Sequence, residues 1–150
     1  MTGYVDEVVI PYDRDLGPVL FDHYGFDTAR RVAEQSPRDV LEIAAGTGIV
    51  TRHLRNQLDN NTRLIAIDIS DSMMDLARTK FLPGEQVMFQ NADATALPFD
   101  DEAFDAVVCQ FGIMFFDQEI AFREAYRVLK RKGRYLFRVW DSEHYNPFAS

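Results

Sequence analysis

Acidic, amide and small residues follow apolar runs at four places in this 150-residue chain, where they could act together on a ligand. Glycines let the backbone turn sharply and approach a ligand closely. Carboxylates accept hydrogen bonds from hydroxyl and amino groups, and they attract cations. The four places are residues 42–48, Asp68, residues 91–94 and residues 110–112. These residue types suit a ligand that carries a diol, an amine and a positive charge.

The positions of two acidic residues indicate a nucleoside. Asp68 lies 22 positions after Gly46, near the offset expected for an acid that accepts hydrogen bonds from both ribose hydroxyls. Asp93 is placed to accept from an exocyclic amine such as that of adenine. Each feature also has a simpler explanation: a glycine-containing turn without a ligand, a solvated acid at Asp68, and a turn-former before Leu97-Pro98 at Asp93.

The charge beside the glycines discriminates between nucleotide cofactors. A dinucleotide would place its pyrophosphate at this loop, where Glu42 would repel it. The third glycine of the dinucleotide motif is also missing, because Thr51 occupies that position. An adenosine compound with cationic groups fits better. S-adenosylmethionine carries a sulfonium and an ammonium, and Glu42 would attract both charges.

Five apolar runs must form the elements that position these residues. Strands are predicted over residues 39–43, 63–67, 86–90, 104–109 and 135–140. Apolar strands alternating with amphipathic helices predict a doubly wound α/β fold, with about five strands in a mostly parallel, Rossmann-like sheet. Ligands in such sheets bind beyond the carboxyl ends of the strands, where the strand order reverses. The four polar places are therefore expected to converge.

Helix signals lie between the predicted strands. A helix should begin at the glycine loop, because Val50, Leu54 and Leu58 recur at helical spacing. Ser70 and Asp117 are each placed to cap a later helix. The buried faces of these two helices would carry Met73, Met74, Ala77 and Phe81, and Ala121, Ala125, Val128 and Leu129. The helix after Asp117 is expected to close at Lys130, Arg131, Lys132 and Gly133.

The sequence before the first predicted strand differs from the rest. Residues 1–36 are predicted to form a helical segment that could cover the cofactor or the substrate, and residues 37–150 to form the binding core. Residues 16–35 indicate two short helices broken near Gly25, with Asp27 capping the second. His53 lies off the buried face of its helix and is expected to be solvated.

Several segments resemble one family of enzymes. Residues 41–51 (LEIAAGTGIVT) resemble the first motif of class I S-adenosylmethionine-dependent methyltransferases, with Ala44 in place of the usual first glycine. Asp68 matches the acid that ends the family's second strand. Residues 91–99 resemble its adenine-side motif, and residues 104–116 and 124–139 resemble the next two elements. The likeness is strongest to the small-molecule branch that includes quinone-biosynthesis methyltransferases.

This resemblance implies binding of S-adenosyl-L-methionine and in-line transfer of its methyl group to a small-molecule acceptor. It also implies a set of cofactor-binding residues at the strand ends. These are Glu42, Ala44, Gly46, Thr47, Gly48, Asp68, Ile69, Met73, Ala92, Asp93, Ala94, Gln110 and Phe111. No residue is a convincing general base, so the catalytic residues stay unassigned.

The sequence departs from the family at its end. The family fold adds an antiparallel pair of strands after the fifth strand, whereas this sequence ends about ten residues beyond it. We therefore expect a truncated domain whose fifth strand is an open edge, able to pair with a second copy. Two alternatives stay open: a truncated or degenerate methyltransferase that binds cofactor or a partner without catalysis, and a nicotinamide-dependent oxidoreductase.

Composition narrows the choice of partner. The net charge of −8 makes nucleic acid an unfavourable partner and favours a small molecule. The single cysteine, Cys109, allows no internal disulfide and fits a cytoplasmic protein. No apolar run reaches the roughly 18 residues of a membrane span. His23, His53 and His144 lack the spacing of metal ligands, so no metal site is predicted.

Overall fold

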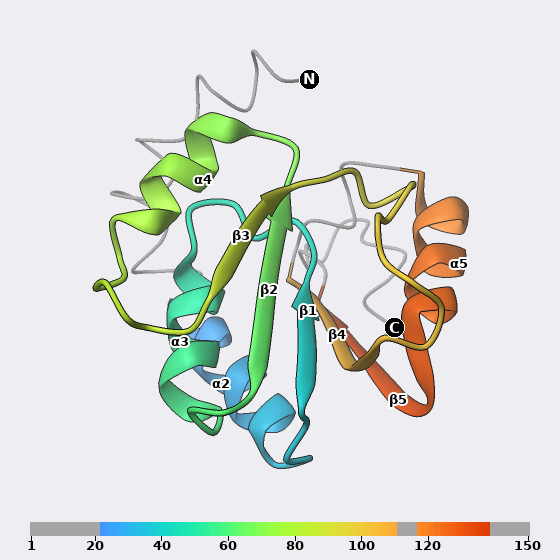
Figure 1. Cartoon of the computed structure of the whole chain (residues 1–150), viewed down its shortest axis with the longest axis horizontal. Coiled ribbons are helices and arrows are strands. Elements are labelled where there is room, and N and C mark those ends of the chain that lie inside the picture. The colour runs from blue at the N-terminus through green and yellow to red at the C-terminus, as the bar shows by residue number, and fades with distance from the viewer. Residues whose placement is uncertain (1–21, 111–116, 139–150) are drawn as a thin grey trace, which may run out of the picture.

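The computed structural model describes residues 22–110 and 117–138 of the chain. Within these ranges the chain forms four helices and five strands (Figure 1). The helices are α2 (Asp22–Ala33), α3 (Ile49–Gln57), α4 (Asp71–Arg78) and α5 (Gln118–Val128). The strands are β1 (Asp39–Glu42), β2 (Arg63–Asp68), β3 (Met88–Asn91), β4 (Phe104–Gln110) and β5 (Leu129–Arg138).

The strands form one sheet in the order β3-β2-β1-β4-β5, and all its paired strands are parallel. The strand order reverses between β1 and β4, where a doubly wound sheet opens its ligand crevice. Figure 1 shows α2, α3 and α4 on one side of the sheet and α5 on the other. The predicted fold class is confirmed.

Each face of the sheet carries its own apolar core. On one face, residues of β1, β2 and β4 pack against α2 and α3, through Ala29, Val32, Val40, Val50, Leu54, Leu58, Leu64, Ala106 and Val108. On the other face, alternate residues of the same strands pack against α5 and the loop after β3, through Leu41, Ile43, Ile65, Ile67, Ala92, Ala94, Leu97, Phe104, Val107, Cys109, Ala121, Ala125, Val128 and Leu129. Burial on both faces explains why the strands are almost continuously apolar.

Two predicted helix caps are confirmed. The Ser70 hydroxyl accepts a hydrogen bond from the backbone N–H of Met73 at 3.3 Å, which satisfies a free donor in the first turn of α4. The Asp117 carboxylate accepts one from the backbone N–H of Ile120 at 3.1 Å and starts α5. Because α4 ends at Arg78, the predicted inner-face residue Phe81 lies beyond the helix.

The predicted break at Gly25 is wrong, because α2 runs through it without interruption. Gly25 is buried, and a side chain added there would lie 3.1 Å from Cδ2 of His53 on α3. The glycine therefore allows two helices to pack closely instead of ending one. Asp27 does not cap a helix either. It lies inside α2, where it pairs with Arg30 at 2.8 Å and with Arg31 at 2.9 Å.

The predicted end of the fifth helix and start of the fifth strand are also wrong. Helix α5 ends at Val128, and the cationic run from Lys130 to Lys132 belongs to β5. Leu129 pairs with Phe104 and Arg134 with Ala106, so β5 advances five residues while β4 advances two. The Lys130 ammonium lies 3.1 Å from the carboxylate of Asp39 and 3.4 Å from that of Asp105. These acids at the strand starts hold the extra residues in a bulge.

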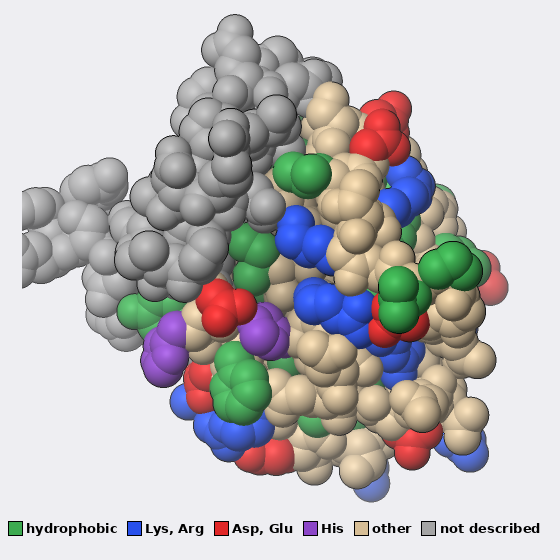
Figure 2. Space-filling view, turned by 90° about the vertical axis from the view of Figure 1, so that its left-hand side faces the viewer, with side chains coloured by type: hydrophobic (Ala, Val, Ile, Leu, Met, Phe, Trp, Pro, Cys, Tyr) green, Lys and Arg blue, Asp and Glu red, His purple; other side chains and the backbone are tan. Residues whose placement is uncertain are grey.

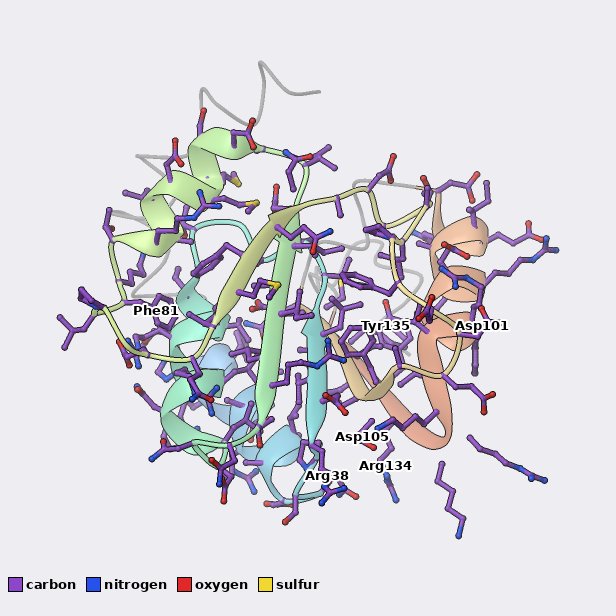
Figure 3. The ribbon with its side chains drawn as sticks, in the orientation of Figure 1. Arg38, Phe81, Asp101, Asp105, Arg134 and Tyr135 are labelled. Atoms are coloured by element: carbon purple, nitrogen blue, oxygen red, sulfur yellow. The ribbon has the colours of Figure 1, made fainter. Side chains whose placement is uncertain are left out.

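Asp105 also fastens the amino end of the sheet. Its carboxylate accepts the backbone N–H groups of Arg38 and Asp39, both at 2.9 Å (Figure 3). These Asp105 hydrogen bonds lie at the amino ends of the strands, away from the carboxyl edge that carries the predicted site. Strand β3 begins at Met88, two residues later than predicted.

Basic side chains gather near the middle of the face that looks out from α3 and α4 (Figure 2). Arg52 of α3 stacks on Phe81, with its guanidinium carbon 4.3 Å from the ring centroid, and forms an ion pair with Glu85 at 2.5 Å. The Arg52 guanidinium lowers the pKa of Glu85 to about 2. His53, predicted to be solvated, has a side chain only 19% exposed and lies 2.8 Å from Asp22. The Arg52–Glu85 ion pair joins α3 to the α4–β3 connection, and the His53–Asp22 contact joins α3 to α2.

Candidate functional site

The chain leaves β1 in a tight loop that is bonded to both neighbouring strands. The N–H of Ile43 donates to the carbonyl of Val108 at 2.7 Å, and the N–H of Ala45 donates to the carbonyl of Ile67 at 2.9 Å. The N–H of Gly48 then donates to the carbonyl of Ala45 at 3.1 Å, and α3 begins. The glycine loop, residues 43–48, therefore lies at the point where the strand order reverses.

Three residues of the glycine loop have positive φ angles: 56° at Ala44, 58° at Gly46 and 85° at Gly48. A Cβ atom added at Gly48 would lie 2.8 Å from Cβ of Ala77, so the absence of a side chain lets α4 pack onto the loop. At Gly46 the nearest atom to an added Cβ is Sδ of Met73, at 3.7 Å. Gly46 thus leaves room for a ligand to approach, whereas Gly48 is required for packing.

Asp68 joins the end of β2 to the glycine loop. Its carboxylate accepts the N–H of Gly46 at 2.8 Å and the N–H of Ser70 at 2.9 Å. Burial raises the pKa of Asp68, and hydrogen bonds from Ser70, Gly46 and Ile69 work in the opposite direction. A carboxylate has about four lone-pair sites, so these three backbone bonds leave Asp68 able to accept a further hydrogen bond from a ligand hydroxyl.

Glu42 at the end of β1 is almost completely enclosed, with 2% of its surface exposed. Burial raises the pKa of Glu42 to about 8; a hydrogen bond from the Thr51 hydroxyl opposes this shift, and the charge of Asp68 adds to it. Without a ligand, Glu42 is therefore largely protonated at neutral pH. A cation placed beside it would favour the carboxylate form.

Asp93 occupies the loop that follows β3, with its side chain exposed between buried Ala92 and Ala94. Its carboxylate accepts hydrogen bonds from the Thr95 N–H at 2.9 Å and the Thr95 hydroxyl at 2.7 Å. Both bonds lower the pKa of Asp93, so it is ionised at neutral pH. The N–H of Ala92 donates to the carbonyl of Asp68 at 3.1 Å, which joins this loop to the end of β2.

Gln110 ends β4 and is 9% exposed. Its side-chain oxygen accepts the hydroxyl hydrogen of Thr28, on α2, at 2.5 Å. Within residues 22–110 and 117–138, its side-chain nitrogen is buried without a hydrogen-bond partner. Phe111, the next predicted cofactor residue, lies outside the described residues.

The remaining predicted residues border this region. Met73 faces Gly46, and the Thr47 carbonyl accepts a hydrogen bond from the Lys80 ammonium at 2.7 Å. Ile69 is 47% exposed, and its carbonyl accepts from the Asn91 amide at 3.1 Å. The structure thus brings the glycine loop, Asp68 and the loop after β3 together through direct hydrogen bonds.

Sequence reasoning missed three side chains that support the site. Lys80 holds the Thr47 carbonyl, and Thr28 holds Gln110. Arg127 of α5 donates to the carbonyls of Leu97 and Phe99, at 2.9 Å and 2.7 Å, and so anchors the loop after β3. Contacts between residues so far apart in sequence leave no local pattern from which to predict them.

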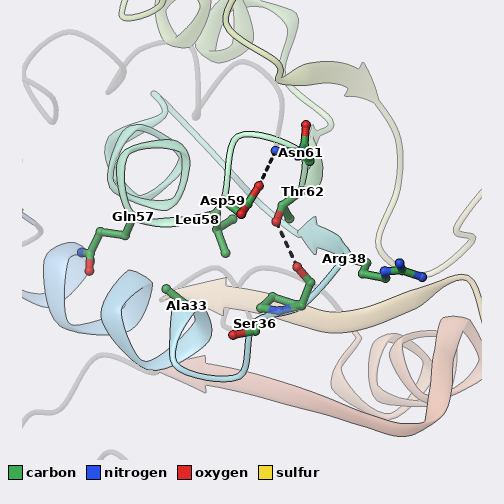
Figure 4. A pocket seen from close by; sticks show the side chains of 9 residues that line it. Ala33, Ser36, Arg38, Gln57, Leu58, Asp59, Asn61 and Thr62 are labelled. Carbon is green, nitrogen blue, oxygen red and sulfur yellow. Dashed lines mark hydrogen bonds between the residues drawn. The ribbon is translucent and has the colours of Figure 1, made fainter.

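A groove of about 700 Å³ lies at the amino ends of β1 and β2, opposite the predicted site (Figure 4). Its lining includes Arg38, Asp59 and Thr62, and the Thr62 hydroxyl donates to the carbonyl of Pro37 at 3.0 Å. Neither the glycine loop nor any predicted cofactor residue lines it. The fold rule for doubly wound sheets places ligands at the other end of the strands.

Known proteins that this chain resembles are methyltransferases. A family model described as a methyltransferase domain matches residues 41–137. A demethylmenaquinone methyltransferase of Thermotoga maritima is 37% identical over 118 residues, covering 74% of this chain and 50% of that protein. The ubiquinone/menaquinone biosynthesis C-methyltransferase UbiE of Hahella chejuensis is 36% identical over 115 residues, covering 74% and 46%.

A solved structure, the DhpI–SAH complex, is similar with a TM-score of 0.73 and 28% identity over 95% of this chain and 69% of that chain. The chain belongs to the S-adenosylmethionine-dependent methyltransferase family, as its sequence motifs predicted. It spans about half the length of the curated relatives it matches. No helix among the described residues has the length and apolar character needed to cross a membrane.

Proposed function

We propose that this chain binds S-adenosylmethionine at the carboxyl edge of the sheet and transfers its methyl group to a small molecule. The observation that carries the proposal is the enclosed carboxyl group of Glu42, which lies next to the glycine loop without an ion pair among the described residues. A buried carboxyl group in this position suits a cationic ligand and disfavours an anionic pyrophosphate.

Three further features fit the cofactor. Gly46 leaves space that a side chain would fill, and the buried Gln110 amide nitrogen lacks a partner within the described residues. Asp68 and Asp93 provide carboxylates at the ends of β2 and β3, on the opposite side of the glycine loop from Gln110. The spread of these groups along the edge matches a ligand with a nucleoside at one end and an amino acid at the other.

The proposed roles follow the order of the strands. Asp68 would hold the ribose hydroxyls and Asp93 the adenine amino group, while Glu42 would attract the ammonium and sulfonium charges. Gly46 would allow close approach of the loop backbone. The other proposed cofactor neighbours are Ala44, Thr47, Gly48, Ile69, Met73, Ala92, Ala94, Gln110 and Phe111.

The protein contributes mainly orientation. When bound, S-adenosylmethionine would supply a methyl group whose carbon the acceptor nucleophile attacks in line, while S-adenosylhomocysteine leaves as a neutral thioether. The glycine loop, held by Asp68 and Lys80, fixes one side of the site, and the end of β4 lies on the other. Holding two reactants in line can lower the barrier by several kcal/mol. We assign no general base among the described residues.

The acceptor is proposed to be a small molecule, because the net charge of −8 disfavours nucleic acid. The names of the two curated relatives make demethylmenaquinol-type compounds the first acceptors to test. A cytoplasmic location stays a prediction that fits the single, buried Cys109.

Calorimetry with S-adenosylhomocysteine and with NADH tests the cofactor. We expect the chain to bind the first with micromolar or tighter affinity, whereas preferential binding of NADH would support the oxidoreductase alternative. Transfer of a labelled methyl group to a panel of small acceptors then tests catalysis. Binding without transfer to any acceptor would support the non-catalytic alternative.

A further inference from the structure

Glu42 and Gln110 lie at the ends of adjacent strands and on the same face of the sheet. Glu42 pairs in register with Val108, and Gln110 lies two residues further along β4. Side chains two residues apart on a strand share a face. Val108 and Val40 both pack in the core under α2 and α3, so Glu42 and Gln110 face those helices.

Each of these two side chains is held by a threonine from the helix above it. The Thr51 hydroxyl, on α3, donates to the Glu42 carboxyl group, and the Thr28 hydroxyl, on α2, donates to the Gln110 side-chain oxygen at 2.5 Å. Both threonines are buried. The hydrogen bond from Thr28 occupies the Gln110 oxygen, which leaves the amide nitrogen as the group available to a ligand.

The two side chains call for ligand groups of opposite charge: Glu42 for a cation and Gln110 for a hydrogen-bond acceptor such as a carboxylate. Glu42 offers a carboxyl group that a cation would convert to the charged form. Gln110 offers a buried N–H donor without a partner among the described residues, and a buried donor of this kind is costly until an acceptor fills it. One ligand fragment with an ammonium and a carboxylate on the same carbon would satisfy both groups.

From this arrangement we infer that Gln110 binds the α-carboxylate of the amino-acid part of S-adenosylmethionine, and that Thr28 positions the Gln110 amide for this contact. The inference rests on the proposed cofactor. A neutral donor suits the position, because a lysine or arginine so close to Glu42 would pair with it and compete with the ligand ammonium for the carboxylate. Helix α2 thus acts on the cofactor site through a side chain of β4.

The test measures binding of three ligands to the full chain by calorimetry. S-adenosylhomocysteine carries both the ammonium and the carboxylate, its decarboxylated analogue keeps only the ammonium, and methylthioadenosine lacks both. Gln110→Met should weaken S-adenosylhomocysteine about 10-fold or more, the range for a lost hydrogen bond to a charged group. The same variant should leave the affinities for the other two ligands nearly unchanged.

Gln110→Glu gives the sharper comparison, because glutamate has nearly the same shape as glutamine but replaces the N–H donor with a carboxylate that repels the ligand carboxylate. It should weaken S-adenosylhomocysteine further than Gln110→Met and bind the decarboxylated analogue at least as well as the wild type. For the helix residue, Thr28→Val should weaken S-adenosylhomocysteine several-fold, and Thr28→Ser should restore most of the affinity. Thermal melting of each variant checks that it is folded.

The ligand comparison separates the possible outcomes. Equal weakening of all three ligands by Gln110→Met would mean a general structural effect and would overturn the inference, as would unchanged S-adenosylhomocysteine affinity. Equal losses in Thr28→Val and Thr28→Ser would remove the positioning role of the hydroxyl. If the wild type binds methylthioadenosine and S-adenosylhomocysteine equally well, the result supports an adenosine site and refutes the carboxylate contact. If it binds neither, the cofactor proposal itself fails.

Discussion

Replacing Glu42 with glutamine should make the cofactor-free protein more stable at alkaline pH and weaken its affinity for the cofactor. The pKa of Glu42 is about 8 in the folded chain, against an ordinary value of 4.5. An acid with a raised pKa holds its proton more tightly in the folded state. The wild-type protein therefore loses stability as the pH rises through the interval from 4.5 to about 8.

The size of the effect follows from that interval. At about 1.4 kcal/mol per pH unit, it corresponds to a loss on the order of 3–5 kcal/mol by pH 9. Glu42→Gln keeps a side-chain oxygen that can accept from Thr51 but cannot ionise. The free energy of unfolding of this variant should consequently exceed that of the wild type by an amount that grows between about pH 4.5 and pH 8 and then levels off.

Binding should change in the opposite direction. Wild-type affinity for S-adenosylhomocysteine, measured relative to Glu42→Gln, should rise with pH as the carboxylate forms. Taking the ratio between the two proteins removes the titration of the ligand's own amino group. Denaturant unfolding and calorimetry at pH 6, 7.5 and 9 provide both readouts. Glu119→Gln, at an exposed helix position, is the matched control. A stability difference that does not vary with pH would refute the argument for a buried, proton-holding Glu42.

Three substitutions and one property of the whole chain give further predictions. Asp68→Ala should weaken S-adenosylhomocysteine binding by about 1.5–3 kcal/mol, or roughly 10- to 100-fold, in calorimetry; unchanged affinity would exclude Asp68 from the site. Gly46→Val should abolish that binding, because a β-branched residue is strained at a φ of 58° and would fill the space for the ligand; full affinity in a folded variant would contradict the loop assignment. Ala44→Gly should raise the unfolding free energy by up to about 1 kcal/mol, because relief of left-handed strain exceeds the extra entropy of the unfolded chain; a lower melting temperature would show that Ala44 is not strained. Strand β5 is an edge of the described sheet, with Phe137 41% exposed, so the chain should self-associate at micromolar concentrations in sedimentation experiments. A monomer throughout that range would argue against pairing through this edge.

Local sequence patterns were sufficient for much of the fold. Ser70 and Asp117 cap helices as predicted, since a cap depends on residues only three positions apart. The run from Lys130 to Gly133 led to a wrong prediction of the end of α5, because cations followed by glycine are typical of a helix end. There the deciding contacts are with Asp39 and Asp105, which are distant in sequence.

The site shows the same limit. The sequence was enough to predict that Glu42, Asp68 and Asp93 lie at the same edge, because strand ends in a parallel sheet meet there. The sequence did not predict the burial that raises the pKa of Glu42, or the hydrogen bond that joins Thr28 to Gln110 across 82 positions. Likewise, the role of Gly25 in the close packing of α2 on α3 depends on residues of α3 that are distant in sequence.

The anchoring of the loop after β3 by Arg127 has a consequence for the entropy of binding. That guanidinium joins the backbone of Leu97 and Phe99 to helix α5, and it also pairs with Asp101 and Glu124. A loop fastened at several points has little conformational freedom left to lose when a ligand arrives. Ordering a free loop residue costs about 1–2 kcal/mol, so most of the interaction energy proposed for Asp93 would remain available as affinity. Helix α5, on the other face of the sheet, would thereby favour the proposed recognition at this edge by holding the loop in place.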